Sequence, residues 1–504
     1  MTSNYYDVVV LGMELGPLTA GALLARRGFR VLVVGQGGAS DEYPCLGFDF
    51  THRPFLLTAA HSPVYRRIFD ELSLGQLFAQ VAEIPSPCYQ VVLPDARIDV
   101  YEDHEKTERE IIRELNVPKD QVQEALKELG RTSGEIDKLF AADVVVPPES
   151  FFERREFSRA QVQNPFHLAR DPDPFARHGA EKALQRFLEP VVKMETAGAP
   201  SPTPLVSHRQ MGAWLFGCRQ ITGGRDGLRR LLCDRIVGHG GDVGPGQSVT
   251  EIIISRSKVT GVRMRGKEEP TGCRTVLADL SPSELAPLVA PNLWSKRFAA
   301  LVANAPEPVL GYGLNLGVDP EVVPSGLAKT AFVCSGDNLG ADLLRVEIVE
   351  QRDKTKAAIH VSCIVPRGEE ESIGTGALRD AILDRMRRIV PFLDNHLRMV
   401  HSPYDGFGPL DLTGEADGET PPVPHPEEVP LWLLRRPPAG GALGVEGFPH
   451  RTGMKGLLLS GGQVVCGLST EGEFMAGWGA AHIAGKIDPS RRRLVMSMRS
   501  KVEM

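Results

Sequence analysis

The residues with the most specific spacing lie near the start of the chain, within residues 7–35, DVVVLGMELGPLTAGALLARRGFRVLVVG. Gly12, Glu14, Gly16 and Pro17 fall where a G-x-G-x-x-G turn would bind the pyrophosphate of a dinucleotide. Gly35 falls where that pattern places an acid that binds the ribose. Glu14 therefore replaces the second glycine and Gly35 replaces the acid. These residues suggest cofactor binding in which two contacts are altered.

The elements around this turn have the pattern of a βαβ unit. The apolar run from Val8 to Leu11 is typical of a parallel strand that is buried on both faces. Apolar residues then recur at helical spacing, and Gly28 is placed to end the helix after basic residues in its last turn. Val31 to Val34 form a second apolar run. The sequence therefore predicts a strand, a glycine turn, a helix and a second strand.

The two altered positions weaken the predicted dinucleotide site. One pair of like charges about 4 Å apart costs about 4 kcal/mol at an effective dielectric of about 20, so Glu14 would repel a pyrophosphate in an unmoved loop. Loss of the acid at Gly35 removes a charged hydrogen bond of about 1.5–3 kcal/mol. Two outcomes are open. Glu14 could turn outward and leave the cofactor bound by other segments, or its carboxylate could take the place of the phosphate at the start of the helix near Pro17.

Composition excludes several functional classes. The chain has 504 residues, a net charge of −7 and no basic stripe, which argues against nucleic-acid binding. No apolar stretch reaches the length of a membrane span, and the first residues lack a signal pattern, so we expect a cytoplasmic protein. The eight cysteines form no C-x-x-C pair and are expected to be reduced. The basic segment at Arg491, Arg492 and Arg493 could contact an anionic membrane or a protein partner.

The later segments extend the α/β pattern over the whole chain. We expect a Rossmann-like domain with a parallel sheet, plus a second α+β domain with an antiparallel sheet. The dinucleotide-binding domain is predicted to comprise residues 1–80, 216–290 and 451–487. The substrate domain is predicted to comprise a largely helical part at 81–215 and a second part at 291–450. Residues 488–504 would form the basic tail.

Four segments in order resemble the flavoprotein superfamily of phytoene desaturases, carotenoid isomerases and amine oxidases. They are the N-terminal βαβ unit, GFDFTHRPF at 47–55, TGGRDGLRRLL at 222–232 with SVTEIIISRSKVTGVRM at 248–264, and LLLSGGQVVCGLSTEGEFMAGWGAA at 457–481. The resemblance implies an FAD cofactor. Gly12 and Gly16 would form the pyrophosphate turn, and the Val249 backbone would meet the adenine. Further site residues implied in the same way are Gly461, Gly462 and Gln463 near the ribityl chain, and Thr470 and Glu471 at a helix start that points to the flavin ring.

This resemblance leaves two functional hypotheses. In the first, the chain is an FAD-dependent oxidoreductase that transfers hydride from an apolar, isoprenoid-like substrate to the flavin, which supplies the difficult chemistry. In the second, it is a flavin-less binding protein on the same scaffold, as Rab GDP dissociation inhibitors are, with Glu14 in the pyrophosphate site. The ligand would be an apolar small molecule or lipid in either case. No catalytic residue and no metal site is indicated by the sequence.

Overall fold

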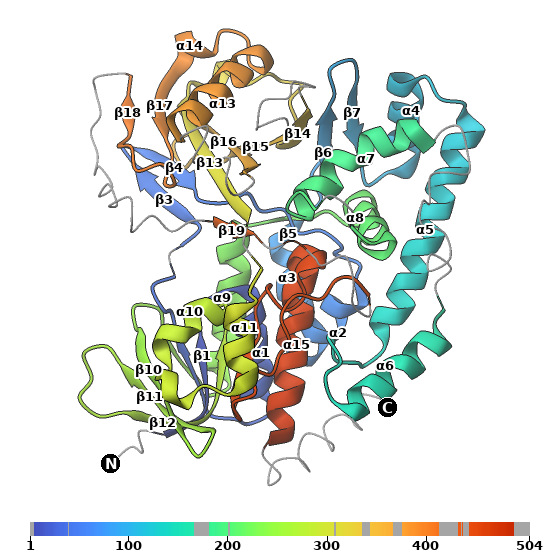
Figure 1. The fold of residues 1–504 in the computed structure, drawn as a ribbon. Helices are drawn as coiled ribbons and strands as arrows, with labels where there is room; N and C mark the ends of the chain where they lie inside the picture. Colours follow the sequence, from blue (N-terminus) through green and yellow to red (C-terminus); the bar gives the residue numbers. More distant parts are fainter. Residues whose placement is uncertain are drawn as a thin grey trace.

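The structure is a computed structural model. It describes residues 5–38, 40–165, 181–199, 202–306, 309–334, 343–365, 375–412, 432–434, 436 and 443–487. The basic tail predicted at 488–504 lies outside the described residues. Figure 1 shows the parallel-sheet domain in the lower part of the molecule and a second sheet in the upper part, with a group of helices along one side.

The lower domain is built on the predicted βαβ unit, which the structure confirms. Strand β1 (Tyr5–Leu11), helix α1 (Leu15–Arg26) and strand β2 (Val31–Val34) follow one another, and β1 pairs with β2 in parallel. Residues Val8 to Leu11 are at most 1% exposed, as expected of a strand covered on both faces. The order of the sheet is β10-β11-β12-β1-β2-β9, and β20 pairs with β12.

The other strands of this sheet come from distant parts of the chain. They are β9 (Asp242–Gly244), β10 (Val249–Ser255), β11 (Lys258–Met264), β12 (Thr271–Ala278) and β20 (Leu457–Leu459). β10 and β11 form an antiparallel hairpin, whereas β12 and β20 run parallel to their neighbours β1 and β12. The helices of this domain are α9 (Gly224–Gly238), α10 (Pro282–Leu285), α11 (Lys296–Ala303) and α15 (Ser469–Ile487).

The upper sheet confirms the expected second, antiparallel sheet. Its order is β18-β17-β13-β16-β15-β14-β6-β7, with β19 on β13, and its pairs are antiparallel except β14 with β6. The strands are β6 (Tyr89–Val92), β7 (Arg97–Val100), β13 (Val309–Val318), β14 (Thr330–Cys334), β15 (Leu343–Val349), β16 (Ala357–Val365), β17 (Leu397–His401), β18 (Leu410–Asp411) and β19 (Trp432–Leu434). Helices α13 (Thr375–Ile389) and α14 (Leu393–His396) accompany it (Figure 1).

The remaining helices lie between and beside the two sheets. They are α2 (Pro63–Glu71), α3 (Gly75–Val81), α4 (His104–Leu115), α5 (Lys119–Ala141), α6 (Phe151–Gln163), α7 (Glu181–Glu195) and α8 (Pro204–Phe216). Two further small antiparallel pairs are β3 (Glu42–Cys45) with β4 (Phe48–Thr51) and β5 (Ala82–Glu83) with β8 (Gln220–Ile221). Among the residues that the structure describes, no helix combines the length and the apolar character that crossing a membrane requires.

Candidate functional site

The site predicted from the sequence lies at the carboxyl ends of the parallel strands. The turn at Gly12 follows β1, Gly35 follows β2, and Gly461 follows β20. This edge of an open α/β sheet is where ligands usually bind. A cavity of about 430 Å³ opens there toward the second domain. Its wall carries five carboxylates, on Glu14, Glu195, Asp279, Glu284 and Glu473, and three guanidinium groups, on Arg53, Arg225 and Arg345.

Three arginines hold the Glu14 carboxylate in place. Oε1 accepts hydrogen bonds from Nη2 of Arg53 at 2.9 Å and Nη2 of Arg229 at 2.6 Å, and Oε2 accepts one from Nη1 of Arg225 at 3.0 Å. Burial alone would raise the pKa of Glu14, but the three arginines hold that pKa well below its usual range. Glu14 precedes α1 but makes no side-chain hydrogen bond to the helix amides. An internal carboxylate therefore uses the positive charge that an anionic ligand would need at this turn.

The sequence did not predict these arginines as partners of Glu14. Arg53 follows β4, and Arg225 and Arg229 belong to the first turns of α9. The TGGRDGLRRLL segment was recognised from the resemblance, but its role here depends on chain packing over about 40 to 215 residues of separation. The sequence did contain a signal for a cluster of positive charge, because all three arginines lie in segments that carry the family resemblance.

The position of Gly35 is closed to any side chain. A Cβ on this glycine would lie 1.8 Å from the carbonyl oxygen of Pro245, in the turn that follows β9. The Gly35 amide donates a hydrogen bond to the Gly244 oxygen at 3.1 Å, which holds the two segments together. The ribose-binding acid is therefore missing, and the space for it is filled by backbone.

The side chain of Gln36 hydrogen-bonds to the backbone groups of Val249 that the resemblance assigned to adenine. Its side-chain Nε2 donates to the Val249 carbonyl at 2.9 Å, and its Oε1 accepts from the Val249 amide at 2.8 Å. Gln36 adopts φ 56°, a conformation that disfavours side chains other than glycine and a few polar ones. Val249 thus has both backbone groups satisfied by an amide from the same chain. The sequence analysis missed Gln36, because nothing local indicates a contact over 213 residues.

Gly12 and Gly461 leave space for the side chain of Asp279 rather than for a ligand. A Cβ on Gly12, which has φ 105°, would lie 2.9 Å from Cβ of Asp279, and a Cβ on Gly461 would lie 1.5 Å from Oδ1 of Asp279. Gly16 allows close packing, because its Cβ would lie 2.4 Å from the Ser460 carbonyl oxygen and 3.0 Å from the Glu473 carbonyl oxygen on α15. Pro17 is buried in the first turn of α1.

Asp279 is a second residue that the sequence analysis missed. It directly follows the buried strand β12, and its carboxyl group lines the cavity. Burial raises its pKa well above the usual range, and the neighbouring carboxylates of Glu14, Glu473 and Glu284 raise it further. Burial likewise raises the pKa of Glu473, although Arg225 contacts this carboxylate at 2.9 Å and opposes the shift. The cavity therefore contains carboxyl groups that bind protons more readily than free ones.

The C-terminal site residues divide into two groups. Gly462, Gln463 and Thr470 line the cavity, as an arrangement around a bound ligand requires. Glu471 does not line it. Its carboxylate accepts from Arg209 Nε at 2.7 Å and Nη2 at 2.6 Å and contacts the Ser62 hydroxyl, so it is buried with 2% of its surface exposed.

An FAD bound as the resemblance implies does not fit these residues. Its adenine would need the Val249 groups that Gln36 uses, its ribose would meet the Pro245 backbone, and its pyrophosphate would meet Glu14. The polar groups of FAD would be buried there without free hydrogen-bond partners, which costs binding free energy. The AMP half of the site is thus filled by the protein, and the cavity beside it remains.

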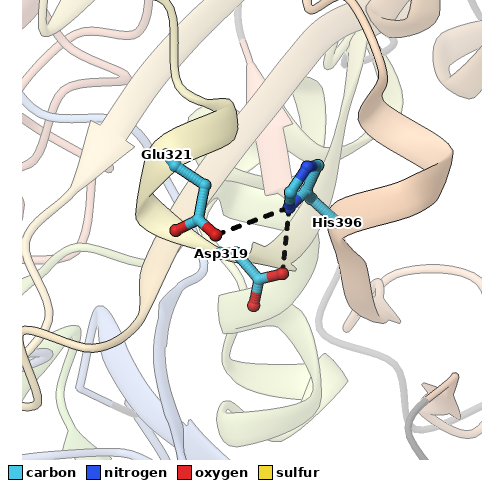
Figure 2. Close-up of side chains that lie close together, drawn as sticks. All are labelled: Asp319, Glu321 and His396. Atoms are coloured by element: carbon cyan, nitrogen blue, oxygen red, sulfur yellow. Dashed lines mark hydrogen bonds and ion pairs between the residues drawn. The ribbon is translucent and has the colours of Figure 1, made fainter.

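A separate cluster of Asp319, Glu321 and His396 has donor atoms close enough to resemble a metal site (Figure 2). His396 Nδ1 lies 3.1 Å from Oδ2 of Asp319 and 3.9 Å from Oε1 of Glu321. However, Arg398 binds both oxygens of Asp319, with Nε 2.9 Å from Oδ1. Because the guanidinium already neutralises this carboxylate, the cluster is an ion-pair network at the end of β17.

The chain matches no protein-family model and no curated protein at the level of sequence. Its fold, however, is similar to solved structures. An oxidoreductase from Methanosarcina mazei is 15% identical with a TM-score of 0.58, over 94% of this chain and 98% of that one. Cyclohexylamine oxidase from Brevibacterium oxydans is 15% identical with a TM-score of 0.54, over 96% and 99%. Putrescine oxidase is 12% identical with a TM-score of 0.54, over 96% and 99%.

These similarities extend over nearly the whole length of each chain, so they include both domains. At such low identity they establish the fold and leave the finer relation to phytoene desaturases a prediction. The chain therefore has the two-domain fold of these solved oxidoreductase and amine oxidase structures.

Proposed function

We propose that this protein is a flavin-independent ligand-binding protein on the fold of the FAD-dependent oxidoreductases. The observation that carries the proposal is the replacement of an entire cofactor half-site by internal groups. Gln36 satisfies Val249, Pro245 fills the space beside Gly35, and Glu14 satisfies Arg53, Arg225 and Arg229. Fold alone does not fix function, and here the site favours the hypothesis without flavin.

The ligand would occupy the cavity between the domains. Its volume of about 430 Å³ lies within the usual range of about 300–1,000 Å³ for small-molecule sites. The apolar, isoprenoid-like ligand expected from the resemblance stays a prediction. The carboxyl and guanidinium groups on the wall favour a ligand that also carries polar groups, because a purely apolar one would leave them desolvated and unpaired.

One observation favours the oxidoreductase hypothesis as a second candidate. Gly462, Gln463 and Thr470 line the remaining cavity, as the resemblance requires of residues near the flavin ring and ribityl chain. A flavin bound there would supply hydride-accepting chemistry, while these residues would orient it. This candidate requires that the protein bind flavin through the cavity alone.

Flavin titration of the purified full-length chain separates the two candidates. We expect a colourless protein that binds added FAD more weakly than about 100 μM, because two or more of the usual contacts are unavailable and each ~1.4 kcal/mol is tenfold in affinity. The readouts are visible absorption and quenching of flavin fluorescence. A protein that is yellow on purification would overturn the proposal and support the oxidoreductase.

Substitution of Glu14 tests whether this carboxylate is what prevents nucleotide binding. Glu14→Gly removes the carboxylate that three arginines share, while Asp41, Asp226 and Glu473 still pair with them. We therefore expect FAD or ADP binding to improve by about tenfold, and further when the substitution is combined with Gln36→Ala. Glu14→Gln keeps the side-chain volume and separates charge from bulk, and Glu321→Gln is a control at a distant exposed carboxylate. No gain in either nucleotide from Glu14→Gly would mean that Glu14 does not block the site.

A further inference from the structure

Helix α6, at the lower right of Figure 1, presents an unusual outer face, and none of its residues lines the cavity described above. Its inner face is formed by Glu153, Phe157 and Ala160, which are at most 5% exposed. Its outer face carries Phe151, Phe152 and Val162, which are 74%, 71% and 79% exposed. Three large apolar side chains on one short helix are therefore left in water.

Two arginines lie among these apolar side chains. At 100° per residue, Phe151, Phe152, Arg155, Arg159 and Val162 fall within one stripe on the side opposite the buried residues. Within the described residues, no hydrogen bond or ion pair engages the guanidinium of Arg155 or Arg159. Elsewhere in the helical region, exposed Arg113 on α4 and Arg131 on α5 are paired with glutamates. The stripe on α6 therefore combines exposed rings with two arginines that form no ion pair within the described residues, in a chain whose net charge is −7.

The helix is held rigidly on its inner side. Ser150 and Glu153 form a capping box at its start, and the Glu153 carboxylate binds Arg451 at 2.6 Å and 3.0 Å. Arg451 precedes β20, so α6 is tied to the parallel-sheet domain. The outer stripe is thus displayed on a fixed element.

We propose that this stripe of α6 docks on an anionic lipid surface. Aromatic rings and arginines together are characteristic of helices that lie at a membrane interface, where the rings enter the headgroup boundary and the arginines meet anionic lipids. A protein partner is less suited to it. A helix of 13 residues is about 20 Å long, so one face offers about 200 Å², whereas a stable protein interface needs about 800 Å² per partner.

The test is sedimentation of the full-length protein with vesicles. We expect binding to phosphatidylcholine vesicles that contain phosphatidylserine, much weaker binding to pure phosphatidylcholine, and loss of binding as salt rises. Arg155→Gln with Arg159→Gln should weaken binding by about 25-fold, from about fivefold per charge. Phe151→Ser with Phe152→Ser should weaken it at least as much.

Phe392→Ser is the matched control, because this side chain is 76% exposed but lies outside α6. It should leave vesicle binding unchanged. All of these side chains are exposed, so the variants should keep the thermal stability of the parent. The proposal is overturned if the protein ignores anionic vesicles, if the α6 variants bind them as well as the parent, or if the α6 face instead mediates self-association in sedimentation velocity. If the α6 variants bound anionic vesicles as well as the parent, the basic residues 491–493 would be the next segment to substitute.

Discussion

At Gly35 the ribose-binding acid of the dinucleotide pattern is absent, and the space for its side chain is also closed. Because a Cβ there would lie 1.8 Å from the Pro245 oxygen, backbone must move to admit any side chain. We expect Gly35→Glu, which restores the acid of the dinucleotide pattern, to lower the free energy of unfolding by about 3 kcal/mol and to add no flavin affinity. Urea denaturation and flavin titration measure both effects. If the variant were as stable as the parent and bound FAD, the site would be open after all.

Asp279 gives the site a pH dependence of known sign. Its pKa is raised in the folded protein, so the folded state binds more protons than the unfolded state above about pH 4, and stability falls as pH rises through that range. Asp279→Asn should therefore stabilise the protein at neutral pH, with a gain that shrinks toward zero below about pH 4. Thermal unfolding across pH checks this. The exposed Asp380→Asn serves as the control, and a gain that did not change with pH would contradict the assignment.

At the level of elements, the close contact of α1 with α15 positions the turn and the cavity together. A Cβ on Gly477 would lie 2.2 Å from the Gly16 carbonyl oxygen and 2.9 Å from Cβ of Thr19. Gly477→Ala should therefore lower the free energy of unfolding by about 1–3 kcal/mol. Gly485→Ala, in the same helix with no atom within 4 Å of the added Cβ, should instead raise it by about 0.5–1 kcal/mol. Equal effects in urea denaturation would exclude the close-packing explanation.

The elements also mark where sequence reasoning succeeds and where it ends. The strands and helix around Gly12 were predictable because apolar runs and helical spacing are local signals, and the structure confirms them. Local signals also miss the break between α2 and α3 near Ser73, which has φ 53°. The partners of Glu14 and Val249 could not be predicted, since they are fixed by packing between segments far apart in the chain.

At the scale of the whole molecule, a buried ion pair joins the helical region to the parallel-sheet domain. Arg209 on α8 and Glu471 on α15 are 1% and 2% exposed, and Arg209 also binds Asp137 on α5 at 2.8 Å. Removing one member of such a pair leaves an uncompensated buried charge, which costs about 3–5 kcal/mol, whereas replacing both by apolar groups often costs little.

We therefore expect Arg209→Met to destabilise the protein by about 3–5 kcal/mol, and Arg209→Met with Glu471→Leu to be less damaging than the sum of the two single substitutions. A double-mutant cycle by urea denaturation measures the difference. Glu471 was expected from the sequence to face a cofactor, but its partners make it a tie between domains. If the two substitutions were simply additive, the pair would contribute nothing as a unit, and the position of α15 beside the cavity would depend on its packing against α1 and α2.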